Sequence, residues 1–405
     1  MSRGMGLRGE AAIVGFHELP CERMPTGKPE FTIEQWARLA AAAVADAGLS
    51  VEDIDGLVTT GVFESNIFVP STVVEYLGLK VNFAEYVDLG GASAAAMVWR
   101  AAAAVELGIC EAVLCAIPAK FLTPTHPDRP LDMTEAMYYG ASSIRYGSPQ
   151  AEFEIPYGYL GQNGPYAQVA QMYGAAYGYD ERAMAKIVVD QRVNANHTPG
   201  AVFHDKPITI DDVLASPIIA TPLHMLEIVM PCMGGSAVLV TSERLARRAR
   251  NRPVWIKGFG EQVPYKSPVY AENPLHTPMS EIAPKAFGMA GLTPADVDMV
   301  SIYDCDTITA LLTLEDAGFC EKGKGMQFVS GHDLTFRGDF PMNTAGGQLG
   351  YGQPGNAGGM HHVCDATRQL MGRAGAAQVA DCNRAFVSGN GGVLSEQEAL
   401  ILVGD

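Results

Sequence analysis

The 405-residue chain carries a formal net charge of −17, and 48% of its residues are hydrophobic. A chain of this size and composition can bury one large core or two fused ones. Its negative charge, with no cluster of Lys and Arg among aromatic residues, argues against nucleic-acid binding. No eighteen apolar residues run unbroken, and the first residues enter a strand pattern without a signal-peptide core. We therefore expect a cytoplasmic protein that has no membrane association.

The cysteines give no sign of a metal or disulfide framework. The chain has eight of them and no C-x-x-C pair, and several lie inside apolar runs. This usage is typical of reduced, mostly buried thiols. The sequence therefore predicts neither a zinc site nor disulfide bridges.

The first elements in the chain form a β-α-β pattern. A buried strand is predicted from Ala11, and an alanine-rich helix follows, with a Thr32–Gln35 capping box at its start and its end near Gly48. Residues 45–58 and 288–301 share Ala, Gly, Leu, Asp and Asp at the same spacing, each copy between a helix pattern and an apolar strand. The repeat predicts two related α/β halves.

The rest of the first half contains a helix that carries small residues on every side. The pattern predicts a helix over 71–77, a strand over 82–87, and a helix from Ala92 to Ala104 that begins just after Gly90 and Gly91. Small residues on every side of a helix indicate burial against close backbone neighbours. A strand ending near Ala119 closes this unit.

Residues 120–215 interrupt the pattern and are rich in Pro, Tyr and Gly, with one clear helix over 181–194. Long irregular segments in compact proteins are usually functional, so we interpret this one as a cap inserted over a site. Its aromatic residues could line a pocket or serve core packing and subunit contacts; they are Tyr138, Tyr139, Tyr157, Tyr159 and Tyr166.

The second half repeats the pattern and adds a glycine-rich loop. Tyr303 and Asp304 are predicted to end a strand, and a helix begins at Thr307. Seven glycines then fall among the seventeen residues from Asn343 to Gly359, where Tyr351 is the only ionisable side chain. Such a loop is costly in chain entropy and usually lines a site. A helix over 361–372 and two strands joined by a glycine turn complete the chain.

Several segments together resemble the thiolase superfamily, most closely its sterol-carrier-protein-type branch. They are ITIDDVLASPIIATPLHMLE with GGSAVLV, YDCDTITALLTLEDAGFC, NTAGGQLGYGQP and SGNGG. The resemblance covers nearly the whole chain and implies a thiolase fold, with two duplicated α/β halves in a layered αβαβα arrangement. We assign residues 1–250 to the first half, including the inserted cap at about 120–215, and residues 251–405 to the second.

The chain departs from the thiolase pattern where thiolases carry their chemistry. Their nucleophilic cysteine precedes the buried helix, and this position holds Gly91, or Gly90 in a register shifted by one. The remaining family positions carry Tyr303 and Gln353 in place of two histidines and Ser388 in place of a second cysteine. Glycine offers no nucleophile, so acyl transfer through a thiol at the start of this helix is not possible.

A retro-aldol cleavage of a β-hydroxyacyl-CoA requires no covalent intermediate, and a phenol can act as its acid and base. The resemblance to thiolase-like aldolases of steroid side-chain degradation implies that Tyr303 and Tyr351 are catalytic, with Asp304, Asn343 and Gln353 as orienting groups. It also implies that the substrate binds along Gly90, Gly91, Gly346, Gly347, Ser388 and Gly389. An ordinary tyrosine is ionised in only about one molecule in a thousand at pH 7, which costs roughly 4 kcal/mol. A hydrogen bond between the phenols, or the Gly346 and Gly347 amides, could offset this cost.

Other mechanisms fit the residues less well. Schiff-base chemistry needs a buried lysine, whereas Lys186, Lys257 and Lys285 lie in segments with exposed patterns. His361 and His362 are adjacent and would point about 100° apart on a helix, so they cannot chelate one metal together. Two alternatives stay open, namely a non-catalytic acyl-CoA or lipid-binding subunit of a larger complex, and acyl transfer through Cys305 or Cys232.

The expected partners follow from the resemblance. It implies a homodimer formed through a strand of the first half. It also implies a small companion protein with an OB fold and a zinc ribbon, which would complete the acyl-CoA site in a heterotetramer. No cofactor is expected, since CoA is part of the substrate, and no metal.

Overall fold

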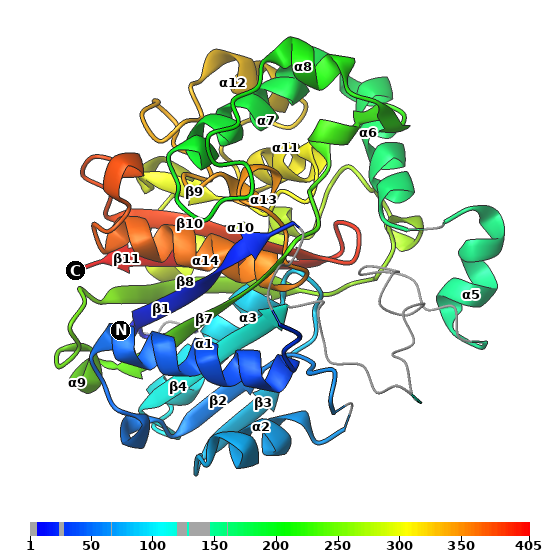
Figure 1. Ribbon diagram of the computed structural model, residues 1–405. Helices are drawn as coiled ribbons and strands as arrows, with labels where there is room; N and C mark the ends of the chain where they lie inside the picture. Colours follow the sequence, from blue (N-terminus) through cyan, green and yellow to red (C-terminus); the bar gives the residue numbers. More distant parts are fainter. Residues whose placement is uncertain (1–5, 24–27, 66, 120–127, 129–145, 160) are drawn as a thin grey trace.

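The computed structural model describes residues 6–23, 28–65, 67–119, 128, 146–159 and 161–405. Its centre is a mixed sheet in the order β3-β2-β4-β7-β1-β8-β11-β10-β9 (Figure 1). The strands are β1 (Ala11–Glu22), β2 (Gly56–Thr59), β3 (Phe83–Tyr86), β4 (Ala112–Ala119), β7 (Met233–Ser242), β8 (Val254–Gln262), β9 (Met299–Ser301), β10 (Arg384–Gly391) and β11 (Glu396–Gly404).

The strand pairing repeats itself on the two sides of the sheet. In the first half β7 runs antiparallel between β1 and β4, and β4 is parallel to β2. In the second half β11 runs antiparallel between β8 and β10, and β10 is parallel to β9. The two sets join where β1 pairs with β8, at Ala12 and Trp255. This topology agrees with a duplicated α/β fold, while the boundary between residues 250 and 251 stays a prediction.

Helices form three layers around the two halves of this sheet. The outer helices of the first half are α1 (Thr32–Ala47) and α2 (Val69–Leu77), and those of the second are α10 (Met279–Ala290) and α11 (Thr307–Asp316). Between the halves lie α3 (Ser93–Glu106) and α14 (Ala357–Leu370), which contact strands of both (Figure 1). The predicted αβαβα arrangement of the thiolase fold is confirmed.

The central helix α3 is buried because its sequence is almost all small. Ala94, Ala96, Ala101 and Ala102 are fully inaccessible to solvent. Without bulky side chains, α14 and the strands of both halves can approach the helix backbone closely. The sequence pattern over 92–104 therefore identified the centre of the molecule.

The described part of the inserted region is helical, and its two long helices pack on the second half. It contains α5 (Pro149–Phe153), α6 (Asn163–Tyr177), α7 (Glu181–Asn196) and α8 (Ile210–Ala215), and a small hairpin of β5 (Ile218–Ala220) and β6 (Leu223–His224) follows it. Tyr166 is buried, whereas Tyr157 is 81% exposed. Tyr138 and Tyr139 lie outside the described residues. Short helices elsewhere are α9 (Glu243–Ala246), α12 (Gly325–Gly331) and α13 (Gly347–Gly350).

Three local predictions were wrong. The Thr32–Gln35 capping box does not form, because the residue before α1 is Phe31, whose amide donates to Glu34 at 2.8 Å. Strand β9 ends at Ser301, two residues before Tyr303. The last helix begins at Ala357 rather than at residue 361, since the glycine-rich loop itself turns into helix.

The cysteines are free, and most of them are buried, as the sequence predicted. In the part of the chain that the structure describes, none of the helices combines the length and apolar character that crossing a bilayer requires.

Candidate active site

Tyr303 occupies the space that a side chain at position 91 would fill. Gly91 lies two residues before α3, and a Cβ atom built on it would overlap the hydroxyl oxygen of Tyr303. The amide of Tyr303 donates to Ser388 Oγ of β10 at 2.9 Å, which fixes the chain where it leaves β9. A phenol oxygen therefore sits beside the positive end of the α3 dipole, which favours a negative charge.

The hydroxyl of Tyr303 is buried among amides. The residue is 4% exposed, and burial raises the pKa of its phenol strongly, with Cys305 and Asp304 adding to the effect. The side-chain amides of Gln353 and Gln348 act in the opposite direction and lower the pKa of this phenol. Burial is the largest contribution, so this phenol needs further stabilisation before it can ionise.

Asp304 anchors the glycine-rich loop. Its Oδ1 accepts from the amide of Gln348 at 2.8 Å, and its Oδ2 accepts from the amide of Leu349 at 3.2 Å. A Cβ at Gly347 would collide with this carboxylate, so only glycine fits there. The carboxylate thereby caps α13 and holds Gln348 next to Tyr303.

Asn343 links the same loop to the end of β9. Its Oδ1 accepts from the amide of Ile302 at 2.6 Å, and its Nδ2 donates to the Ile302 carbonyl at 2.9 Å. Both polar atoms are engaged by the backbone, and the side chain is fully buried. The contacts of Asn343 therefore position the loop, and they do not reach a phenol.

Tyr351 faces a different polar cluster. Its ring stacks on His361 with centroids 3.9 Å apart, and His361 Nδ1 lies 2.7 Å from Glu18 Oε1. Burial raises the pKa of Tyr351, and Glu18 adds to this effect. Burial also acts to raise the pKa of Glu18, but the charges of His361 and Arg368 outweigh it and lower that pKa to about 2. Tyr351, Glu18 and Arg368 line a cavity of about 620 Å³.

The two phenols are separated by the adjacent histidines of α14. The ring of Tyr303 lies 5.8 Å from that of His362, whereas Tyr351 stacks on His361. No hydrogen bond joins the two hydroxyls among the described residues, and the amide of Gly346 donates to the Asn343 carbonyl at 2.7 Å. Neither phenol–phenol bonding nor the Gly346 amide offsets the cost of ionisation here.

The other predicted binding positions surround the start of α3. Gly90 has a φ of +54° and lies against the backbone of Gly391, and Gly389 packs on Ala92. Gly346 lies instead against Ala195 of α7. Gly90, Gly91, Ser388 and Gly389 are thus close together, whereas Gly347 lies against Asp304 and Gly346 lies against α7.

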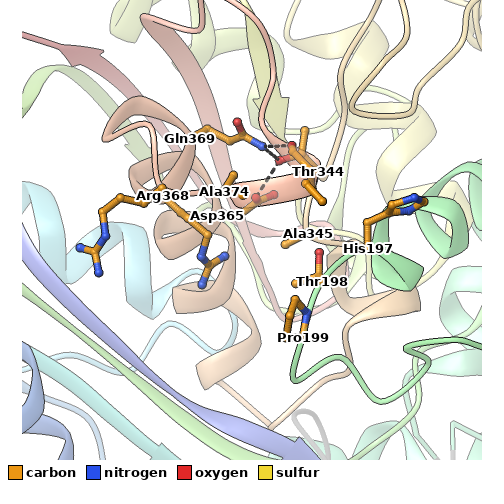
Figure 2. Close-up of a pocket in the computed structure, with 13 residues that line it drawn as sticks. His197, Thr198, Pro199, Thr344, Ala345, Asp365, Arg368, Gln369 and Ala374 are labelled. Atoms are coloured by element: carbon orange, nitrogen blue, oxygen red, sulfur yellow. Dashed lines mark hydrogen bonds between the residues drawn. The ribbon is translucent and has the colours of Figure 1, made fainter.

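A second cavity of about 320 Å³ lies next to the larger one, and Pro199, Arg368 and Arg373 line both. Figure 2 shows Thr344 and Asp365 facing each other in its wall, with Gln369 above them. Thr344 Oγ1 donates to Asp365 Oδ1 at 2.8 Å and accepts from Gln369 Nε2 at the same distance. Tyr303 is not among the residues that line this cavity or the larger one.

Comparison with known proteins places the chain in a family. Residues 260–404 match the model of the thiolase C-terminal domain-like family. A 17-hydroxy-3-oxo-4-pregnene-20-carboxyl-CoA lyase of Mycobacterium tuberculosis is 32% identical over 90% of this chain and 92% of that protein. A steroid side-chain-cleaving aldolase of Thermomonospora curvata is 30% identical over 96% of each chain. The chain belongs to the thiolase-like aldolases.

A solved Ltp2-ChsH2(DUF35) aldolase extends this likeness to three dimensions. The two structures superpose with a TM-score of 0.86 at 28% identity, over 98% of this chain and 99% of that one. The similarity of this thiolase-like aldolase to named lyases supports a lyase function.

The two thiols that the sequence left open for acyl transfer in this thiolase-like aldolase are both buried. Cys305 is buried, its Sγ lies 3.4 Å from Asp306 Oδ2, and burial raises the pKa of its thiol well above the ordinary value. Cys232 is 2% exposed. Since the thiolate is the reactive form, acyl transfer through Cys305 is disfavoured.

Sequence reasoning missed the groups that surround each phenol. His362, Gln348 and Asp365 lie behind Tyr303, and His361 and Glu18 lie behind Tyr351. The two histidines were considered only as metal ligands, and Glu18 lies 343 residues away from its partner in the chain. The sequence offered one indication of these two roles: adjacent residues on a helix point about 100° apart, so the two imidazoles contact different groups.

Proposed function

We propose that the chain cleaves the Cα–Cβ bond of a β-hydroxyacyl-CoA by a retro-aldol reaction. One tyrosine oxygen takes the proton of the substrate hydroxyl, and the C–O bond becomes a carbonyl. The electron pair of the broken bond passes to the thioester, and the resulting enolate carbon takes a proton from the other tyrosine. A ketone or aldehyde and a short acyl-CoA leave. The cycle is complete when the first tyrosine has lost the proton that it took and the second has regained one, a transfer that leaves the number of protons unchanged.

The position of the Tyr303 oxygen is the observation that supports this mechanism best. It fills the volume of the missing side chain at Gly91, next to the start of α3. In a thiolase frame this is where the acyl group would meet the nucleophile, so an acid-base group here is well placed to act on a thioester substrate. Gln353 assists, because its side-chain amide acts to lower the pKa of this phenol.

Two features support a bulky, steroid-like substrate and a companion protein. Two relatives are named for cleavage of steroid-type molecules, and a similar solved structure is named as a complex with a DUF35 protein. Tyr303 and Tyr351 are only 4% and 5% exposed in this chain by itself. A small OB-fold partner with a zinc ribbon would complete the acyl-CoA site in a heterotetramer.

Independence of metals and of Schiff-base chemistry is part of the proposal. Lys186 is paired with Asp190, and Lys257 Nζ donates to the Gly9 carbonyl at 2.7 Å, so both amines are engaged outside this site. We expect the cleavage activity to survive treatment with a chelator. We also expect it to survive borohydride added together with the substrate.

The test is to replace Tyr303 and Tyr351 by Phe one at a time and to assay the complex with the companion on a synthetic β-hydroxyacyl-CoA. Each variant is expected to fold normally and to lose at least 100-fold in kcat, since acid-base catalysis contributes about 10²–10⁴-fold. Tyr157→Phe is the matched control, because this phenol is 81% exposed. Full activity of both active-site variants would refute the proposal.

A binding subunit without chemistry is the second candidate. It is favoured by the fact that Tyr303 lines neither of the two cavities described above. If the protein, alone and with its companion, binds CoA esters but never splits a β-hydroxyacyl-CoA, this second function is correct.

A further inference from the structure

Two side chains at the start of α6 hydrogen-bond the glycine turn, residues 389–395, where β10 leads into β11. Gln162, the residue before this helix, donates from Nε2 to the carbonyl of Gly392 at 3.4 Å. Tyr166 follows one helical turn later, and its hydroxyl donates to the same carbonyl at 3.1 Å. Residues four apart on a helix lie on one face, so both side chains can reach one acceptor. The inserted region therefore contacts the site at this turn.

The hydroxyl of Tyr166 belongs to a buried chain of hydrogen bonds. It accepts from Asn390 Nδ2 at 3.0 Å, and Asn390 Oδ1 accepts from Gln397 Nε2 at 3.3 Å. Gln397 Oε1 in turn accepts from the amide of Met279, the first residue of α10, at 2.8 Å. All three side chains are buried. Loss of the hydroxyl would therefore leave the Asn390 amide without this acceptor in a place where an unmade hydrogen bond is costly.

The glycine turn lies against the backbone that leads into α3. A Cβ on Gly391 would lie 2.0 Å from the carbonyl oxygen of Leu89, so only glycine permits this close approach. A Cβ on Gly91 would meet the hydroxyl oxygen of Tyr303 and, at 2.5 Å, the carbonyl oxygen of Asn390. The phenol of Tyr303 and the backbone of Asn390 therefore border the same space.

We propose that Tyr166 is a positioning residue of the active site, which holds Asn390 and the glycine turn against the start of α3 and so maintains the space beside the Tyr303 oxygen. The inference rests on the proposed function of Tyr303. Tyr166 acts through the turn and exchanges no proton with the substrate. By this contact α6 of the inserted region contributes to the geometry in which the substrate meets Tyr303.

The test is Tyr166→Phe, which removes one hydroxyl and keeps the ring, assayed in the full complex on the synthetic β-hydroxyacyl-CoA. We expect kcat to fall about tenfold or more, because a small displacement of the reacting groups is costly, while KM changes less than about threefold.

Tyr173→Phe is the matched control. Tyr173 is buried on the same helix, but its hydroxyl donates to Glu315 of α11. Both variants lose one buried hydrogen bond, so both should lower the melting temperature to a similar extent. Only Tyr166→Phe should lower kcat, and the control should stay within about twofold of the wild type.

Amide hydrogen exchange measures the positioning without a substrate. In Tyr166→Phe the amides of residues 389–392 should exchange about tenfold faster or more, because local opening of the turn becomes easier. In Tyr173→Phe their exchange should match the wild type. Unchanged exchange of these amides in Tyr166→Phe would overturn the proposal whatever the protein cleaves.

Asn390→Ala is the second variant, and it serves also where Tyr166→Phe cannot be purified. It should lower kcat about tenfold or more, and the double variant should lose less than the product of the two single losses, because the hydroxyl and the amide share one hydrogen bond. Wild-type kcat in either single variant, or an equal loss of kcat in Tyr173→Phe, overturns the inference. Full activity of Tyr303→Phe would instead overturn the proposed function and leave the exchange result standing, so the two failures are distinct.

Discussion

At the scale of single residues, the absence of a side chain at position 91 is what admits the Tyr303 phenol. Besides the overlap with Tyr303, a Cβ at this position would lie 2.5 Å from the Asn390 carbonyl oxygen, which is backbone and cannot move aside cheaply. Gly91 is not needed for a left-handed turn, because its φ is not positive. Its role is the space that it leaves empty.

Gly91→Ala is therefore expected to destabilise the fold by about 3 kcal/mol through overpacking, and to abolish cleavage by displacing Tyr303. Thermal unfolding and the β-hydroxyacyl-CoA assay measure the two effects. Gly288→Ala is the matched control, because a methyl group added to this exposed glycine of α10 would meet no atom within 4 Å. It should gain about 0.5–1 kcal/mol from the higher helix propensity of Ala. A Gly91→Ala protein as stable and active as the wild type would contradict this account.

At the scale of elements, two facing strands bring together two carboxyl groups beside the central helix, of which Glu398 is buried and Glu261 is partly exposed. Glu398 of β11 is directly opposite Glu261 of β8. Burial and the hydrogen bond to Glu261 raise the pKa of Glu398 well above its ordinary value. Burial also acts to raise the pKa of Glu261. The effects of Glu398 and of the Arg100 guanidinium on α3 are larger than that of burial, and they lower the pKa of Glu261 to about 2. Glu398 therefore holds the shared proton and Glu261 holds the charge.

This pair makes stability depend on pH in a defined direction. The folded pKa of Glu398 lies above its ordinary value of 4.5, so the unfolded chain loses this proton first as the pH rises. The contribution of Glu398 to stability is therefore fully present below pH 4.5 and declines above it. Glu398→Gln, which mimics the protonated acid, should keep or raise the melting temperature at pH 8 and flatten its decline.

Glu261→Gln provides the contrast. It removes the carboxylate that Arg100 hydrogen-bonds at 2.9 Å, so that among the described residues Arg100 keeps only the ion pair with Glu85, and it should cost about 1 kcal/mol at pH 7. Melting temperatures from pH 4 to pH 9 separate the two variants. Equal destabilisation by both would show that the proton is not held by Glu398.

At the scale of the whole molecule, β3 is the free edge of the first half of the sheet. It pairs only with β2 among the described strands. Large apolar side chains near this edge are exposed, namely Tyr86 at 45%, Phe63 at 58% and Phe68 at 78%. An exposed edge with apolar side chains is suited to pairing with a second copy of the chain.

Tyr86→Lys should disrupt the expected homodimer, because a two-fold interface receives the new charge twice. Light scattering behind a sizing column should then give the mass of one chain instead of two. Tyr270→Lys, in the second half and 65% exposed, is the control and should leave the mass of the wild type unchanged. A dimer that survives Tyr86→Lys would place the interface elsewhere.

The sequence predicted the elements well because its apolar patterns are local. The all-small run from Ala92 to Ala104 and the repeat at 45–58 and 288–301 each indicated packing without any tertiary information. It predicted less of the site. Asn343 could be recognised as part of a loop of functional character, but not as a backbone bridge to Ile302.

Sequence by itself therefore determined the fold and what the site lacks. The residue at position 91 alone shows that the thiol is missing. The small side chains of the helix that follows are enough to predict that this helix is buried. Only the tertiary structure decided what surrounds each phenol, turning Tyr303 toward His362 and Tyr351 toward His361 and Glu18. The physical reason is that burial and hydrogen-bond partners set the acidity of a group, and here they come from segments far apart in the chain.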